Sequence, residues 1–575
     1  MESRRATRHG SRRPFHSLLC LAAAAWAAAS LSGGGAFLAA GRSGRASEAS
    51  AEAADAVDVD GAPSELRLAL VTGGAQALIL LFLVGLQRRH EARGQAQAGA
   101  KAWEGADVKL LAVCFLIGWV VRFVVPIPED VTTQAWSMLA IFIAMICGVV
   151  MGPLPPAGTT LVALAAAVFT GTVTFAEGLR AFTDEVVWLV LLAFFFAEGF
   201  QKTGLGDRIA LTVIKAVGGT TLGLAYGLNA AELMVAAAMP CSAARAAAVF
   251  YPITTSVCRA SGSAPEKGTQ KKCGAFLVEC CYQATATSSC MFLTGAAQNY
   301  FVLKLSAGVG IEVPSPFTTW FMAALGPGVL SFLLAPLLAL RLLPPEDRRT
   351  PEAPAAAQKK LEAMGPVSDE EKVFGAVMIG MVFLWAMSSS LGIPPVVTAL
   401  CGQSLLLMAG VSTWEDCARN SKAWGTFVSF ASLVGLAAML NNLGIVKWLA
   451  SSITEQITAA GLHGAPAFLV ILAAYWVIHY LFASQVAHVS ALFQPFLLML
   501  TQTGTPGLPA VLALAFASNL FMTLTPYASA QSAVILGGRY ITQGEWYKAG
   551  FVYFVFYFVL WVGVGGLWWR AIGLI

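Results

Sequence analysis

The sequence predicts an all-α polytopic membrane protein with an inverted repeat, and its composition and hydrophobic pattern are the first evidence. Hydrophobic residues make up 57% of the 575 residues and charged residues only 12%, a balance that excludes an ordinary water-soluble domain. Apolar blocks of about the length that crosses a bilayer recur along the chain. These blocks are Leu110–Val125, Ala135–Met151, Val186–Phe200, Leu222–Met239, Trp320–Leu340, Val373–Leu391, Ala465–Phe482 and Gly550–Gly566.

A third observation, an internal repeat, relates the two halves of the chain. The segment Cys241–Pro252 (CSAARAAAVFYP) recurs as Ser484–Pro495 (SQVAHVSALFQP), which places Arg245 and His488 at equivalent positions in apolar surroundings. An ionisable side chain inside a membrane segment costs about 2.5–3.5 kcal/mol on insertion scales, so such a pair indicates a function. Duplicated halves that build one midplane site are typical of secondary transporters. Taken singly, Arg245 could instead cap a helix, and His488 could be a hydrogen-bonded core histidine.

The first 100 residues predict a targeting leader. Residues 1–36 combine several arginines with a short apolar run and a group of small residues, as in a signal peptide. Residues 37–100 resemble a transit peptide and contain a second hydrophobic segment, 66–86, followed by a basic flank. This order resembles the bipartite leaders of proteins sent to complex plastids. The alternative is a plain secretory signal followed by an ordinary first membrane helix.

The rest of the chain divides into two predicted transporter halves, residues 101–341 and 373–575. The polar segment 342–372 between them is rich in Pro, Glu, Asp, Lys and Arg, and we expect a surface linker there. The loop after the first repeat, Arg259–Lys272, is basic, whereas the loop after the second, Thr501–Pro509, is uncharged. This asymmetry favours loops on opposite membrane faces, as an inverted repeat requires.

Each half also contains a Ser/Thr-rich apolar stretch that ends in glutamine, Thr285–Gln298 in the first and Ser518–Gln531 in the second. Several apolar segments fall short of about 20 residues and are interrupted by Gly, Pro, Ser and Thr. Irregular backbone at membrane depth is tolerated where it lines a polar cavity. The pattern therefore predicts half-helices and re-entrant hairpins.

Signals for enzymes, metals and nucleic acids are weak. The sequence contains no HExxH, GxSxG or GxxxxGK[ST] motif, and its eleven cysteines form no CxxC pair, so neither a catalytic centre nor a metal or cofactor is predicted. His479 and His488 are nine residues apart, a spacing that does not place both on one face of a helix. Glu198, Glu232 and Glu279 lie in or near membrane segments and are possible proton carriers. The net charge of +4 gives no indication of nucleic acid binding.

The candidate binding residues suit a dicarboxylate, which needs compensation of two charges and donors at both ends. The guanidinium of Arg245 can bind a carboxylate with two N–H groups, and His488 can donate and gain charge. Hydroxyl and amide groups at the repeats and breaks supply neutral donors, although a single membrane hydroxyl more often only packs between helices. The predicted substrate-binding residues are Arg245, His488, Ser242, Ser289, Thr294, Ser484, Gln485, Thr525 and Gln531.

Several motifs resemble the plastid 2-oxoglutarate/malate translocators of the divalent-anion/sodium symporter family. The resemblance implies two re-entrant hairpins, two broken helices at Thr287–Thr294 and Thr523–Gln531, a scaffold portion that forms a homodimer, and elevator-type movement of the substrate-carrying portion. It runs from about Trp188 to the C-terminus. The motifs are MPCSAARAAAVFYPI (Met239–Ile253), FLTGAAQN (Phe292–Asn299), HYLFASQVAHVSAL (His479–Leu492), SNLFMTLTPYASAQSAV (Ser518–Val534) and GVGGLWWRAIGL (Gly563–Leu574).

The hairpin-tip motifs depart from those of sodium-coupled family members, which carry Ser-Asn-Thr. Here the tips read Cys241-Ser242-Ala243 and Ser484-Gln485-Val486. Sodium is a hard cation that needs several oxygen ligands, and these changes remove oxygens, as in the plastid exchangers that work without sodium. Pro526 is a further departure, because plastid relatives usually carry histidine before the following tyrosine.

We therefore expect a dicarboxylate antiporter of the plastid inner envelope, embedded in the bilayer, that exchanges 2-oxoglutarate or another C4/C5 dicarboxylate for malate. Glutamate is a further possible substrate. One amino group decides between 2-oxoglutarate and glutamate, and no residue in the sequence indicates which of them is preferred. The alternatives are a sodium- or proton-coupled carboxylate or sulfate symporter of another membrane and, less favoured, a channel or receptor.

Overall fold

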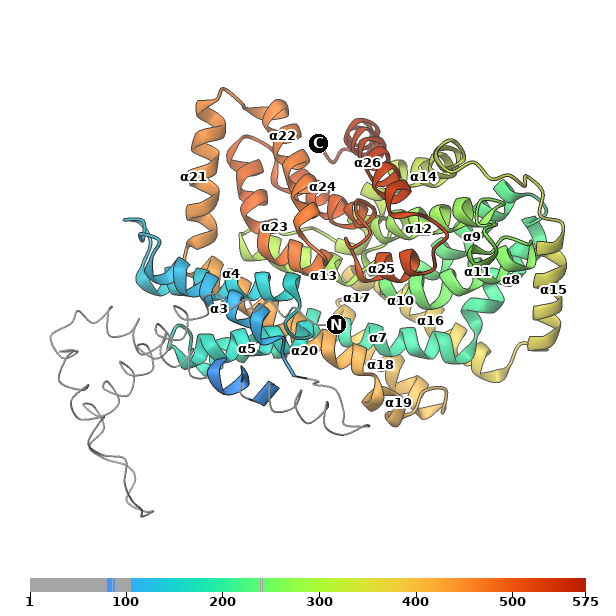
Figure 1. Ribbon diagram of the computed structural model, residues 1–575, viewed down its shortest axis with the longest axis horizontal. Helices are drawn as coiled ribbons and strands as arrows, with labels where there is room; N and C mark the ends of the chain where they lie inside the picture. Colours follow the sequence, from blue (N-terminus) through green and yellow to red (C-terminus); the bar gives the residue numbers. More distant parts are fainter. Residues whose placement is uncertain (1–79, 85, 88–104, 238, 240) are drawn as a thin grey trace, which may run out of the picture. The chain divides into compact units, whose positions relative to one another are not determined.

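The computed structural model of the protein describes residues 80–84, 86–87, 105–237, 239 and 241–575 (Figure 1). The predicted signal peptide 1–36 and nearly all of the predicted leader 37–100 lie outside these residues. Within the described part, helices are the only regular secondary structure besides one isolated bridge between Thr220 and Arg349. The predicted all-α class is therefore confirmed for this part of the chain.

The described chain forms two compact units. The smaller unit includes residues 105–127 and 143–155, and the larger one includes residues 128–142 and 156–575. In the smaller unit, Asp107 caps the N-terminus of helix α3 (Val108–Phe123), and its carboxylate accepts hydrogen bonds from two backbone N–H groups of the first turn. This unit also contains the second part of helix α4 (Thr133–Met151).

The larger unit contains the same order of helices twice. In each copy, a long apolar helix and a shorter helix precede a helical hairpin, an interrupted helix and a final long helix. The first copy consists of α7 (Glu185–Thr203), α8 (Leu205–Val217), α9 (Thr221–Ala236), α10 (Ser242–Ala244), η2 (Arg245–Phe250), α11 (Tyr251–Ala260), η3 (Pro265–Lys267), α12 (Gly274–Met291), η4 (Leu293–Gly295), α13 (Ala297–Gly308) and α14 (Pro316–Leu342). The second consists of α20 (Ser421–Asn442), α21 (Ile445–Ala459), α22 (Gly464–Val477), η5 (Ile478–Leu481), α23 (Gln485–Gln502), α24 (Gly507–Leu520), η6 (Phe521–Thr523), α25 (Ala530–Gly537), α26 (Gln543–Val559), η7 (Leu560–Val564) and α27 (Gly565–Ala571).

The duplication extends upstream of these helices. A short helix precedes the long apolar helix in both copies, and each begins with a capping box, formed by Thr174 and Glu177 in α6 and by Thr413 and Asp416 in α19. Two such boxes at corresponding places show that the repeat includes helix starts that the sequence motifs did not mark. The helices concerned are α5 (Pro156–Phe169), α6 (Phe175–Leu179) and η1 (Arg180–Thr183) in the first copy, and α16 (Asp369–Ala386), α17 (Ser388–Leu391), α18 (Pro395–Met408) and α19 (Trp414–Arg419) in the second.

Six helical segments in the described residues are long and apolar enough to cross a membrane. Large apolar side chains are exposed on these and neighbouring helices, for example Ile379 (73% exposed) and Phe383 (61% exposed), one turn apart on α16. Water does not favour such surfaces, whereas lipid tails do. The six segments are Thr133–Met151, Glu185–Thr203, Pro316–Leu342, Ser421–Asn442, Gly464–Leu481 and Gln543–Ala571.

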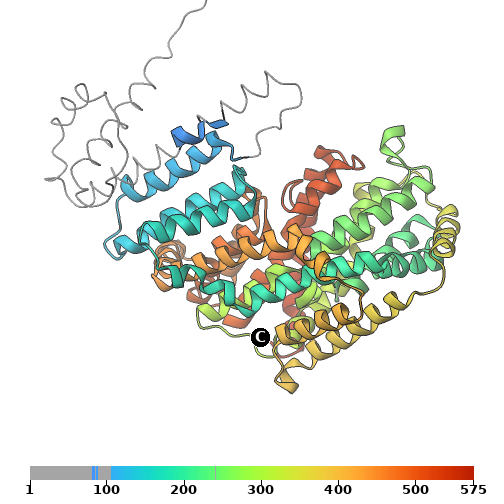
Figure 2. The same cartoon turned by 90° about the horizontal axis from the view of Figure 1, so that it is seen from below.

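The interrupted helices form the buried centre of the larger unit. All residues of α12 are buried, and so are the residues of α24 from Pro509 onward. The two helices pack against each other, and each also contacts the incoming arm of the hairpin of its own half, α9 or α22 (Figures 1 and 2). Helix α12 ends at Met291 and α24 at Leu520, where the backbone leaves the helical path. The predicted hairpins and broken helices are thus confirmed.

The predicted linker 342–372 contains a helix, α15 (Glu352–Met364), which packs along α8 and α11. Backbone and side-chain groups fix its two ends. Before the helix, the Thr350 hydroxyl donates to the carbonyl of Gly218 at 2.7 Å, and after it Arg208 pairs with Glu371 at 2.6 Å. This segment is therefore attached to the first half along its length.

Candidate functional site

The two hairpin tips have the same local structure. Cys241 lies before α10 in extended backbone, and its Sγ accepts a hydrogen bond from the Ala244 N–H at 3.4 Å. Ser484 lies before α23 in extended backbone, and its Oγ accepts from the Ala487 N–H at 3.3 Å. Equivalent residues of the sequence repeat thus cap equivalent helices. Ser242, the first residue of α10, is also buried.

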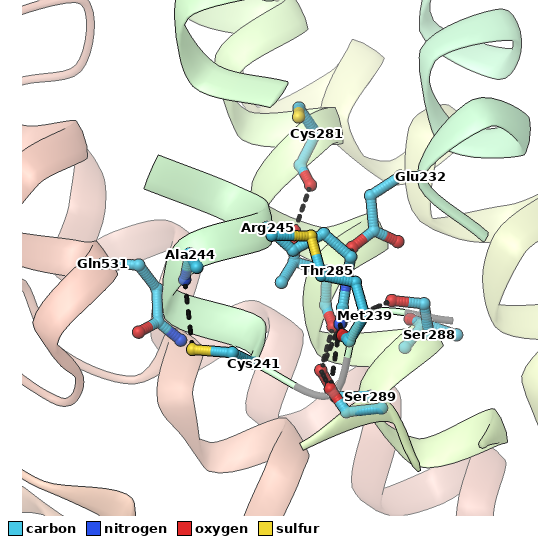
Figure 3. Close-up of polar contacts among 12 residues, drawn as sticks. Glu232, Met239, Cys241, Ala244, Arg245, Cys281, Thr285, Ser288, Ser289 and Gln531 are labelled. Atoms are coloured by element: carbon cyan, nitrogen blue, oxygen red, sulfur yellow. Dashed lines mark hydrogen bonds and ion pairs between the residues drawn. The ribbon is translucent and has the colours of Figure 1, made fainter. Parts of the chain in front are cut away.

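Arg245 lies one turn after the first tip and is fully buried (Figure 3). Its Nε donates to Glu232 Oε1 of α9 at 2.5 Å, and its Nη1 donates to the carbonyls of Met239 and Gly295 at 2.8 and 2.9 Å. Its Nη2 donates to the hydroxyls of Ser288 and Ser289 at 3.2 and 2.9 Å. The guanidinium therefore joins both arms of the hairpin, the tip and the break of α12.

All five N–H groups of Arg245 are satisfied by these protein oxygens. The two serine hydroxyls donate their own protons to the carbonyl of Thr285, so their lone pairs are free to accept from the arginine. A direct contact between Arg245 and a substrate carboxylate stays a prediction, and in this conformation such a carboxylate would have to replace a protein acceptor. The contacts themselves indicate that Arg245 holds the tip in place.

His488 occupies the corresponding place one turn after the second tip and is also fully buried. Its ring contacts Tyr475 of α22 with the centroids 4.5 Å apart and Phe521 at the second break with the centroids 4.6 Å apart. Tyr475 is the counterpart of Glu232, because each lies thirteen residues before the nitrogen-bearing side chain it contacts. The Tyr475 hydroxyl in turn lies 2.8 Å from Ser518 Oγ at the end of α24.

His479 and His488 are in direct contact, with their Nδ1 atoms 3.2 Å apart. The prediction that a nine-residue spacing separates the two rings is wrong, because it holds only within one continuous helix. His479 belongs to η5 and the chain turns at the tip before His488, so the two arms of the hairpin bring the rings together. The described residues contain no group of three or more potential metal ligands.

Other predicted residues hold the tips to the breaks. The Thr294 hydroxyl donates to the carbonyl of Ala237 at 2.8 Å, just before the first tip. The Gln485 amide donates to the carbonyl of Ser518 at 2.9 Å in the second half. Gln531 on α25 lies beside Cys241 and Ala244, where α25 meets α10 (Figure 3). Thr525 is buried within the second break.

A chain of amides, which the sequence motifs did not mark, connects the two breaks. Gln298 Nε2 donates to Asn519 Oδ1 at 2.9 Å, and Asn519 Nδ2 donates to Asn299 Oδ1 at 2.7 Å. Asn299 then donates to the carbonyl of Ser289 at 2.8 Å, next to the Arg245 cluster. The first hairpin tip also contacts the second half through α25, and α23 contacts the first half through α13. The two clusters therefore belong to one connected site.

The sequence analysis does not predict five polar residues of this site as binding residues, although it names Glu232 as a possible proton carrier. These residues are Glu232, Tyr475, His479, Asn299 and Asn519. A usable signal existed for Glu232 and Tyr475. Both are polar residues within apolar hairpin arms at corresponding places in the repeat. Extending the repeat comparison backwards from the tips would have paired them.

The protein-family model for the sodium:sulfate symporter transmembrane region matches residues 106–575 of this chain, which is most of its length. The chain belongs to this family. The resemblance to divalent-anion/sodium symporters is thereby confirmed, and the chain is a membrane transporter rather than an enzyme.

The symporter family contains close relatives of this chain among plant proteins. The chain is 44% identical to Dicarboxylate transporter 2, chloroplastic, of Spinacia oleracea over 470 residues, covering 82% of this chain and 83% of the relative. It is 40% identical to Dicarboxylate transporter 1, chloroplastic, of the same plant over 477 residues, covering 83% and 84%. A bacterial relative, the putative malate transporter YflS of Bacillus subtilis, is 38% identical over 476 residues, covering 82% and 98%.

Two solved transporters align with the chain at 14% sequence identity. The Neisseria gonorrhoeae MtrF structure aligns with a TM-score of 0.49 over 80% of this chain and 97% of that one. The Alcanivorax borkumensis YdaH structure aligns with a TM-score of 0.44 over 71% and 89%.

Proposed function

We propose that this symporter-family protein is a dicarboxylate antiporter of the plastid inner envelope, which exchanges 2-oxoglutarate or another C4/C5 dicarboxylate for malate without sodium. Its identity of 40–44% with chloroplastic dicarboxylate transporters supports the substrate class and the compartment. The family match to residues 106–575 includes the hairpins and breaks, which carry the polar cluster. Homodimer formation and elevator-type movement belong to the same proposal.

The proposal that exchange does not require sodium rests on the surroundings of Arg245. A sodium ion at the first tip would need several oxygen ligands from the tip and the break. The carbonyls of Met239 and Gly295 and the hydroxyls of Ser288 and Ser289 are oxygens of this kind, and all four accept from the guanidinium. A permanent charge that is part of the protein occupies this oxygen cluster, so an ion is not needed to organise it.

The substrate is proposed to bind between the two tips, in contact with both breaks. Ser242 and Gln531 would serve the first tip, while Ser484, Gln485 and Thr525 would serve the second. Arg245 and His488 lie behind the tips, and a substrate carboxylate that reached Arg245 would replace one of its protein acceptors. Ser289 and Thr294 hold the first tip against its break. This division keeps all the predicted residues in the site but assigns them different tasks.

Malate uptake into proteoliposomes tests the proposal. Vesicles that contain the purified protein are loaded with malate or left empty, and labelled malate uptake is measured with sodium or with potassium outside. We expect uptake into loaded vesicles at the same rate in both salts, and little uptake into empty vesicles. Strong sodium-stimulated uptake into empty vesicles would instead establish a sodium-coupled symporter.

A further inference from the structure

The hydrogen bonds of the second hairpin determine which nitrogen of each histidine carries a proton. His479 Nε2 lies 3.0 Å from the carbonyl oxygen of Ala528, and a carbonyl oxygen only accepts, so this nitrogen is the protonated one. In a neutral imidazole the other nitrogen is then an acceptor. His479 Nδ1 therefore accepts from His488 Nδ1 at 3.2 Å. His488 carries its own proton on Nδ1.

This arrangement leaves His488 Nε2 as an unprotonated acceptor. The atom is buried and has no hydrogen-bond partner among the described residues, and His488 as a whole is 0% exposed. Buried polar atoms are nearly always paired, so an unpaired one within an otherwise connected cluster indicates a missing ligand. A water molecule or a proton could fill this position, and of the two only a proton would add the positive charge that favours a bound anion.

We propose that the His479–His488 pair binds one proton, at His488 Nε2, together with the transported dicarboxylate. This inference rests on the proposed function. The neutral pair adds a lone pair and no charge to the site, whereas the protonated pair adds an N–H donor and a positive charge that attracts an anion. Because binding free energies are reciprocal, an anion that binds the charged form better also raises the affinity for the proton.

The geometry limits the pair to one proton. Protonation at His488 Nε2 retains both existing hydrogen bonds, the one to Ala528 and the one between the rings. A second proton would have to enter at His479 Nδ1 and would place two N–H groups against each other across 3.2 Å. The rings of Tyr475, Phe482 and Phe521 lie 4.5–4.9 Å from His488, where aromatic groups can stabilise a cation.

The titratable groups that face His488 are His479 from η5 and the Tyr475 hydroxyl from α22, and this hydroxyl is bonded to Ser518. Helix α24 carries no titratable residue. The other helices packed against α23 carry titratable side chains without a described contact to His488, namely Tyr300 and Lys304 on α13, Lys422 on α20, and Lys447 and Glu455 on α21.

The first hairpin has a different charge arrangement at the equivalent position. Arg245 is permanently charged, but Glu232 neutralises it within the same cluster. The first copy therefore adds no net charge to the site, and the second adds one positive charge only when a proton is bound. A divalent anion would then cross as a species of net charge −1, whichever dicarboxylate is carried.

Proton uptake on binding tests the inference with the full-length purified protein and malate. Titration calorimetry at pH 7.5 in two buffers of different ionisation enthalpy gives the number of protons bound per malate. At this pH malate is fully ionised. We expect about one proton per malate in the wild type, and an affinity that falls about tenfold per pH unit as the pH is raised.

His488→Gln should abolish both the proton uptake and the pH dependence, while His463→Gln, which changes an exposed histidine, should leave both unchanged. The wild-type measurement decides even if His488→Gln does not fold. Malate binding without proton uptake would overturn the inference and leave the proposed function intact. A protein that binds no dicarboxylate would refute both.

Discussion

At the scale of single residues, the buried ion pair between Arg245 and Glu232 dominates the first hairpin. Both side chains are 0% exposed, and burial of two charges is compensated only if their remaining hydrogen-bonding groups are satisfied. Arg245 meets this condition with five acceptors, whereas Glu232 Oε2 has no partner among the described residues. Removing the arginine would therefore leave a buried carboxylate uncompensated.

Replacement of Arg245 tests whether its charge serves the substrate or only the fold. Arg245→Gln should lower the free energy of unfolding by about 3–5 kcal/mol and abolish exchange. The double variant Arg245→Gln/Glu232→Gln replaces the ion pair by neutral amides of similar size, so it should regain most of the stability. We expect its malate affinity to stay at least tenfold reduced, because a charge-assisted contact is worth about 1.5–3 kcal/mol. Thermal unfolding and vesicle exchange measure the two effects separately.

Arg259 provides the matched control, because its side chain is 62% exposed and its Nε lies 3.7 Å from Glu266 Oε1, so its charge is not buried. Arg259→Gln should change neither stability nor exchange. If the double variant exchanges malate with wild-type affinity, the pair is purely structural and the prediction of an anion-binding role for Arg245 fails.

At the scale of elements, the breaks depend on close approach of backbone segments. Gly295 ends the short helix η4, and its carbonyl accepts from Arg245. A Cβ atom at this position would lie 2.9 Å from the carbonyl oxygen of Ser288 and from the Cα of Ser289. Both are backbone atoms of the end of α12, which a rotamer change cannot move. Glycine is therefore required at position 295, because the Cβ atom of any other residue would clash with this backbone.

Gly295→Ala should separate the first break from the end of α12 and weaken the hydrogen bond to Arg245. We expect at least a tenfold loss of exchange and a destabilisation of about 1–3 kcal/mol, the usual range for overpacking. Gly380→Ala on α16 is the matched control, since its Cβ meets no atom within 4 Å and alanine favours a helix. Equal exchange by both variants would show that the break does not need this close contact.

At the scale of the whole molecule, the duplication organises the described chain. Each half supplies a hairpin and an interrupted helix, and each hairpin contacts the helix that follows the break of the other half, α10 with α25 and α23 with α13. A movement of one hairpin would therefore be transmitted to both halves. Elevator-type movement is consistent with this arrangement and stays a prediction.

The leader is the whole-molecule feature that a cell experiment can test. A fluorescent protein fused to residues 1–101 should reach the plastid envelope in an alga with complex plastids, because the order of basic, apolar and hydroxyl-rich blocks resembles bipartite leaders. Microscopy with an envelope marker gives the location. A fusion to residues 1–36 alone is the control and should enter the secretory pathway only. Retention of the longer fusion there would support the plain secretory alternative.

The sequence by itself determined the class of the protein, the two hairpins and the two breaks. Composition and the length of the apolar blocks predict a membrane protein, because a chain with few charges and many long apolar segments is stable only in a bilayer. The hairpins were predictable because Cys241 and Ser484 start matching motifs in the two halves. The breaks were predictable because hydroxyl-rich apolar stretches recur at the same place in each half, where the family resemblance also puts them.

Only the tertiary structure decided how the candidate residues are used. It placed Glu232 against Arg245, joined His479 to His488 across a turn, and linked Asn299 to Asn519 over more than two hundred residues of sequence. Each of these contacts connects separate helices or opposite arms of a hairpin, and periodicity within one segment carries no information about them. The type of each polar residue is known from the sequence, but its hydrogen-bond partner depends on which helices pack together.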